Sequence, residues 1–153
     1  MLETIKRLFA YDAWANARAL DSLNGARDGK ALAPLAHLLV SEQIWLMRLL
    51  GEDTSTVDKS PELSQAECSS LFEETRAGFA SYLGSLDEEG LGSLLTYKNF
   101  KGAELQTPVG EILAHVAMHG AYHRGQVAKA LRAGGHAPAD TDYITFVRET
   151  GNQ

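Results

Sequence analysis

The sequence has very little cysteine and no long run of apolar residues. Cys68 is its single cysteine, so no internal disulfide can form and the cysteine count gives no indication of secretion. Glu42 and Arg48 interrupt the most apolar stretch, whereas a membrane-spanning helix needs roughly 18 or more consecutive apolar residues. The first residues also lack the basic-then-apolar order of a signal peptide. We therefore expect a cytoplasmic protein without a membrane-spanning segment.

The sequence also lacks any run of lysine and arginine, and its formal net charge is −6. Nucleic-acid binding draws most of its affinity from phosphates neutralised by basic side chains. The same shortage of basic residues argues against binding to an anionic membrane surface. The charge pattern therefore excludes nucleic acid and membrane as expected partners and leaves a small-molecule substrate.

What the chain does contain is helical periodicity over most of its 153 residues. Apolar residues at spacings of three and four predict helices over residues 2–23 and 34–51, with Pro34 in the first turn of the second. Ser64 and Glu67 form a capping-box pattern at the start of a third helix. We expect residues 1–153 to form one domain, because this length suffices to bury a substantial core.

The remaining segments predict a hairpin and two further helices. Residues 94–106 flank a Lys-Gly turn signal and predict a short hairpin-like excursion. A fourth long helix follows, with Thr107 as its cap, Pro108 at its first position and the Gly134-Gly135 pair at its end. A short helix is expected over residues 141–150. The fold class is therefore all-α: an antiparallel four-helix bundle, with room for a crossover in the link that carries the hairpin.

Three histidines recur every four residues on the expected fourth helix: His115, His119 and His123. Side chains four apart lie above one another, roughly 5–6 Å between Cβ atoms, so two such imidazoles can bind one metal ion. His115 and His123 lie about 12 Å apart along the helix axis and are too distant to act as a pair. The spacing leaves open whether His119 pairs with His115 or with His123.

His37 lies in an apolar stretch of the second helix and can face that pair. Bundle metal sites are assembled from side chains on facing helices, and three protein nitrogens leave a position for water or substrate, as in catalytic zinc sites. The alternative is that the histidines merely pack in the core, and spacing alone does not decide between the two. The motifs Glu-x-x-His and His-Glu-x-x-His do not occur, which disfavours a di-iron site and a zinc protease.

Residues 119–126 resemble the His-x-x-x-His-Arg-x-Gln signature of the DinB/YfiT-like family. Three further segments, 11–16, 37–48 and 141–149, resemble its other motifs in the same order. The resemblance implies a four-helix bundle, often a homodimer, that holds a divalent metal through three histidines. The matching ligands here are His37, His119 and His123, with His115 outside the set.

The resemblance also implies a chemistry, because relatives include bacillithiol and mycothiol S-transferases and a mycothiol-dependent maleylpyruvate isomerase. We expect a metal-dependent enzyme that transfers a low-molecular-weight thiol to an electrophile. The metal would be zinc or nickel, with iron or manganese as alternatives, since imidazole suits several metals. The alternatives are a non-enzymatic metal-binding stress-response protein, or a hydrolase or isomerase with the same centre.

Four polar residues near these motifs have open roles. Asp12 and Asn16 interrupt the apolar face of the first helix, where they would either hydrogen-bond a ligating imidazole or cap helix ends and bind buried water. For Arg124 and Gln126 we expect a structural salt bridge or a dimer contact. No catalytic residue besides the metal ligands is assigned.

Overall fold

The computed structural model describes residues 1–24 and 29–151. The described part is mostly helical, as the sequence predicts, with a single two-stranded sheet. Its elements in chain order are α1 (Leu2–Asp21), α2 (Leu32–Leu49), α3 (Gln65–Ser85), α4 (Glu88–Gly92), β1 (Leu94–Lys98), β2 (Glu104–Pro108), α5 (Val109–Ala133) and α6 (Tyr143–Thr150).

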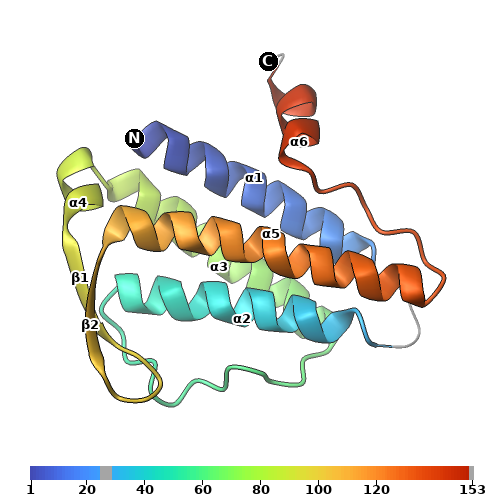
Figure 1. The fold of residues 1–153 in the computed structure, drawn as a ribbon, viewed down its shortest axis with the longest axis horizontal. Helices are drawn as coiled ribbons and strands as arrows, with labels where there is room; N and C mark the ends of the chain where they lie inside the picture. Colours follow the sequence, from blue (N-terminus) through green and yellow to red (C-terminus); the bar gives the residue numbers. More distant parts are fainter. Residues whose placement is uncertain (25–28, 152–153) are drawn as a thin grey trace.

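The four long helices pack as a closed ring in which α1 and α2 each contact both α3 and α5 (Figure 1). α1 and α5 run in one direction and α2 and α3 in the other (Figure 1). Hydrogen bonds at the ends agree, since the amino group of Met1 contacts Glu88 just after α3, and Gln65 at the start of α3 contacts Asn24 after α1. The α1–α3 and α2–α5 pairs are therefore antiparallel.

The other two neighbouring pairs, α1–α5 and α2–α3, run parallel, which the prediction of an antiparallel arrangement did not include. The crossover lies in residues 50–64, between α2 and α3, and not in the link that carries the hairpin. A segment of this length can extend roughly 50 Å, whereas the 18 residues of α2 rise only about 27 Å. The chain can therefore return to the starting end of α2 before α3 begins.

The apolar core is divided into two clusters by a polar layer at mid-height of the long helices. One cluster contains Leu2, Phe9, Leu49 and Leu113, and the other contains Leu20, Leu35, Phe72 and Leu131 among others. Between them each of three helices contributes buried polar side chains: Asp12 and Asn16 from α1, Glu42 from α2 and Arg124 from α5.

The local sequence signals are largely reproduced. Ser64 and Glu67 form the predicted capping box at α3, and β1 and β2 form the predicted hairpin, with Gly102 in its turn at positive φ. Thr107 does not cap α5. Thr107 pairs with Leu95 within the hairpin, and α5 begins at Val109, directly after Pro108. Thr107 therefore belongs to the strand and cannot also be the capping residue of the helix.

The C-terminal segment folds back over α1. The hydroxyl group of Tyr11 donates a hydrogen bond to the carbonyl oxygen of Thr141 over 2.9 Å, and Phe146 of α6 is buried against Tyr11 and Ala15. Among the described residues no helix is long and apolar enough to cross a membrane.

Candidate metal site

His37 on α2 and the pair His119 and His123 on α5 lie together where these two antiparallel helices meet. Their possible ligand atoms all lie within 4.8 Å of one another. The Nε2 atoms of His119 and His123 are 3.0 Å apart, and the ring of His37 lies 4.7 Å from that of His123 between centroids. Two nitrogens on one tetrahedral zinc ion are about 3.4 Å apart. The geometry thus fits a divalent metal bound by these three residues.

The outer ring nitrogens of two of these histidines are held by hydrogen bonds. Nδ1 of His37 lies 3.1 Å from the backbone oxygen of Lys59, and Nδ1 of His123 lies 2.9 Å from Oε1 of Gln126. Both oxygens only accept, so each Nδ1 carries the hydrogen and donates it. The lone pair of each ring is then on Nε2, and Nε2 of His123 faces Nε2 of His119. This is the arrangement by which neighbouring groups orient metal-ligating histidines.

The environment favours the neutral form of the two imidazoles on α5. Burial, followed by the neighbouring His123, His115 and His37, lowers the pKa of His119 to about 4. Burial also lowers the pKa of His123, against the opposing effect of its hydrogen bond to Gln126. Metal binding requires the neutral imidazole. The pKa shifts of His119 and His123 therefore favour metal binding.

The family model of DinB matches residues 1–153. The chain belongs to the DinB family. It is similar to Protein DinB of Bacillus subtilis (strain 168), with 27% identity over 160 aligned residues that cover 92% of each chain.

In this DinB-family chain His115 lies beside the cluster and not within it. Its ring stacks between Trp45, at 5.7 Å, and His119, at 5.5 Å, and the cluster of three ligand atoms does not include it. Of the two pairings that the spacing left open, the structure brings together His119 and His123.

Next to His115 the hairpin and α2 form an aromatic box around Arg48. Its guanidinium carbon lies 4.8, 5.1 and 4.9 Å from the ring centroids of Trp45, Tyr97 and Phe100, and the amine of Lys59 lies 4.0 Å from that of Phe100. Burial lowers the pKa of Arg48, and its Nε has no hydrogen-bond partner. Two cationic side chains are therefore held over the aromatic rings of this box, and one of those rings, Trp45, lies next to His115.

Asp12 and Asn16 do not contact the histidines, contrary to one hypothesis from the sequence, nor do they cap a helix. Nη1 of Arg124 donates to Oδ1 of Asp12 and to Oδ1 of Asn16, both over 2.6 Å. Each residue of an α-helix is rotated about 100° from the last, so Arg124 faces α1 while His123 faces α2. The predicted structural salt bridge of Arg124 is confirmed.

The roles of Gln126 and Glu42 were not predicted from the sequence. Gln126 holds His123 and forms no salt bridge, and its spacing of three from a histidine on the same helix was the available signal. Glu42 was interpreted only as a charge that interrupts an apolar stretch. It is buried, and the amide of Asn16 donates to both of its oxygens, over 3.0 and 3.2 Å.

Proposed function

We propose that this chain is a divalent-metal-dependent enzyme that transfers a low-molecular-weight thiol to an electrophilic substrate. His37, His119 and His123 would hold the metal inside a four-helix bundle. The observation that supports this most strongly is the convergence of three imidazoles, two of them fixed by outer hydrogen bonds. In the described part of the chain this cluster has three such groups and no fourth, which is the donor number of catalytic zinc sites.

A divalent metal bound there would supply positive charge that stabilises a thiolate at neutral pH. The residues of the chain do the rest. Lys59 and Gln126 fix the orientation of two ligands, and low pKa values keep protons off the nitrogens. Arg48 and Lys59 place positive charge over the aromatic rings of Trp45 and Phe100, and Trp45 lies next to His115. Such charges suit the carboxylates that low-molecular-weight thiols commonly carry.

The finer points of the proposal concern the metal and the assembly. Zinc or nickel suits three imidazoles best, with iron or manganese as further candidates. We propose that residues 1–153 form one domain, which works as a cytoplasmic homodimer on a small-molecule substrate. A hydrolase or isomerase reaction at the same centre, or a metal-binding stress-response role without catalysis, would use the same three ligands.

The experiment begins with the metal content of the purified protein and of the variants His37→Ala, His119→Ala and His123→Ala. His115→Ala serves as the matched control, because it removes an imidazole from the same helix face without touching the cluster. We expect about one metal ion per chain in the wild type and the control, and loss in the other three.

The metal-loaded wild type is then assayed with monochlorobimane and a panel of thiols: cysteine, glutathione, bacillithiol and mycothiol. Turnover that depends on both the metal and one thiol supports the proposal. Metal at full occupancy without turnover on any thiol would refute thiol transfer and leave hydrolysis, isomerisation or the non-catalytic role. Absence of metal from the wild type after reloading would refute the metal centre itself.

A further inference from the structure

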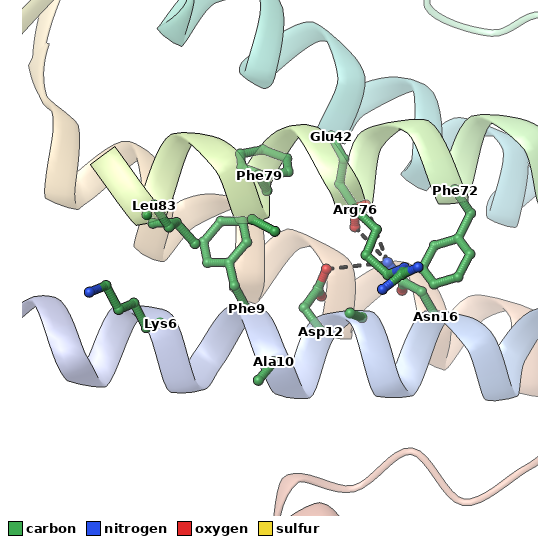
Figure 2. Close-up of a pocket in the computed structure, with 13 residues that line it drawn as sticks. Lys6, Phe9, Ala10, Asp12, Asn16, Glu42, Phe72, Arg76, Phe79 and Leu83 are labelled. Atoms are coloured by element: carbon green, nitrogen blue, oxygen red, sulfur yellow. Dashed lines mark hydrogen bonds between the residues drawn. The ribbon is translucent and has the colours of Figure 1, made fainter. Parts of the chain in front are cut away.

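A separate cavity of about 470 Å³ lies between α1 and α3, on the side of the helix ring opposite the α2–α5 pair that carries the histidines. Figure 2 shows its apolar part formed by Phe9, Phe79 and Leu83 and its polar end formed by Asp12, Asn16 and Glu42. Its volume is within the range of about 300–1,000 Å³ typical of small-molecule sites, which are mostly apolar with a few convergent polar groups.

Among the buried side chains of the polar end and its neighbour Arg124, acids outnumber cations by one. Asp12 and Glu42 are 4% and 5% exposed, and the buried cation that contacts this layer is Arg124, which binds Asp12. Glu42 receives hydrogen bonds only from the neutral amide of Asn16. An ionised Glu42 would therefore be a buried charge without an ionic partner, which is costly.

The environment of Glu42 favours its protonated form. Burial and the adjacent Asp12 raise the pKa of Glu42 well above its ordinary value, against the smaller opposing effects of Asn16 and Arg124. A positive charge that enters the cavity would lower this pKa again. The cavity thus has an acceptor whose ionisation is favoured by a bound cation.

We infer that this cavity binds a small organic amine, with its apolar body against the phenylalanines and its ammonium group at the Asp12–Glu42 pair. The aromatic walls add to this preference, since phenylalanine faces attract cations. Binding exchanges one charge for another: the ammonium enters, and the carboxyl proton of Glu42 leaves to solvent. The carboxyl O–H of Glu42 is the one bond that breaks, and its proton is taken up by water or buffer.

Other occupants fit less well. A divalent metal is less favoured, because among the described residues the histidine group is the one cluster with three metal-binding side chains. An anion would add negative charge beside Asp12. Two cations also line the cavity, Lys6 and Arg76, and Figure 2 shows Arg76 next to Asn16 at the polar end. Each of them pairs with an acid one turn earlier on its own helix, Glu3 and Glu73, which reduces its effect on an entering ammonium group.

The test is isothermal titration calorimetry of the metal-loaded protein with three probes of one shape: phenethylamine, phenethyl alcohol and hydrocinnamate. We expect the amine to bind at least about 10-fold more tightly than the alcohol, and hydrocinnamate more weakly than both. Because the pKa of Glu42 is raised in the ligand-free protein, titrations in buffers of different ionisation enthalpy should show release of up to about one proton per amine bound. Equal affinity for amine and alcohol, or no binding of the amine, would overturn the inference.

Variants locate the binding. Glu42→Gln keeps the shape and neutral charge of the protonated acid, so the variant should fold. It should lose proton release and most of the preference for the amine. Ala80→Phe fills the mouth of the cavity from an exposed position of α3, and Ala77→Phe is its control, exposed on the same helix outside the cavity. We expect Ala80→Phe to abolish binding and Ala77→Phe to leave it unchanged.

One further variant separates this site from the proposed metal centre, which an amine could also ligate. His119→Ala should bind phenethylamine as tightly as the wild type does, because the cavity does not include the histidines. If His119→Ala abolishes amine binding while Ala80→Phe does not, the amine binds at the histidines and the inference is wrong. Failure of thiol transfer would not affect either result.

Discussion

Gln126 holds His123 from outside the proposed metal centre, and its replacement tests whether that hydrogen bond matters. In Gln126→Leu the Nδ1–H of His123 loses its acceptor at 2.9 Å. The ring is then free to rotate or to carry its hydrogen on Nε2, the atom that faces His119. Leucine is a good helix former, so α5 should remain intact and the change should be confined to the histidine cluster.

The size of the effect follows from this one hydrogen bond. Between neutral groups its loss costs about 0.5–1.5 kcal/mol, and about 1.5–3 kcal/mol when one partner is charged. A metal-bound imidazole is strongly polarised and lies toward the upper range. We therefore expect metal affinity to fall about 10–100-fold, equivalent to about 1.4–2.7 kcal/mol.

The measurement is competition with a chromophoric chelator at fixed pH. Gln126→Glu is the matched variant, because a carboxylate at this position still accepts from Nδ1 and makes the imidazole a better ligand. Its affinity should equal or exceed that of the wild type. Gln106→Leu, on the exposed hairpin, controls for the loss of an amide elsewhere. Wild-type affinity in Gln126→Leu would refute the reasoning, since the outer hydrogen bond would then contribute nothing.

Three further predictions concern the polar layer, each measured by urea denaturation. Asp12→Ala leaves Arg124 as a buried charge without its partner, so the free energy of unfolding should fall by about 3–5 kcal/mol. Glu42 has a raised pKa, so the folded state binds its proton more tightly. Its contribution is full below the ordinary pKa of 4.5 and is lost as pH rises through the higher folded value; Glu42→Gln should flatten this loss above pH 4.5. A Cβ at Gly120 would overlap the carboxylate of Asp12, whereas one at Gly125 meets nothing within 4 Å. Gly120→Ala should therefore destabilise the protein by about 1–3 kcal/mol, and Gly125→Ala should stabilise it by up to about 1 kcal/mol.

The features that the sequence predicts correctly are those fixed by neighbouring residues. The capping box of Ser64 and Glu67 and the hairpin turn at Gly102 each depend on a few consecutive residues, and both are present. The start of α5 was misplaced because Thr107 can either cap a helix or extend a strand, and the pairing with Leu95 decides. That partner is 12 residues away, so no local signal contains the answer.

The spacing of the histidines alone could not predict which of them form the cluster. A repeat of four residues makes His115 and His123 equivalent partners for His119. The choice depends on which turn of α5 lies opposite His37, and this is set by the packing of α2 against α5. The resemblance to the DinB family supplied this choice before the structure did. The burial of Glu42 could not be predicted for the same reason. A charged residue in an apolar helix has the same sequence pattern whether its side chain faces solvent or a buried polar layer.

The polar layer and the histidines lie at the same height of the molecule, and α5 connects them. His123 and Arg124 are consecutive, so one turn of this helix supplies an imidazole to the side of α2 and a guanidinium to the side of α1. The guanidinium is fixed by two hydrogen bonds of 2.6 Å to α1, and Gly120 lets α1 approach at this level. Arg124 thus limits rotation and sliding of α5. A misplacement of about 1 Å in an active site can cost roughly 100-fold in activity. The buried charges therefore weaken the apolar core but also keep His119 and His123 on α5 in position opposite His37 on α2.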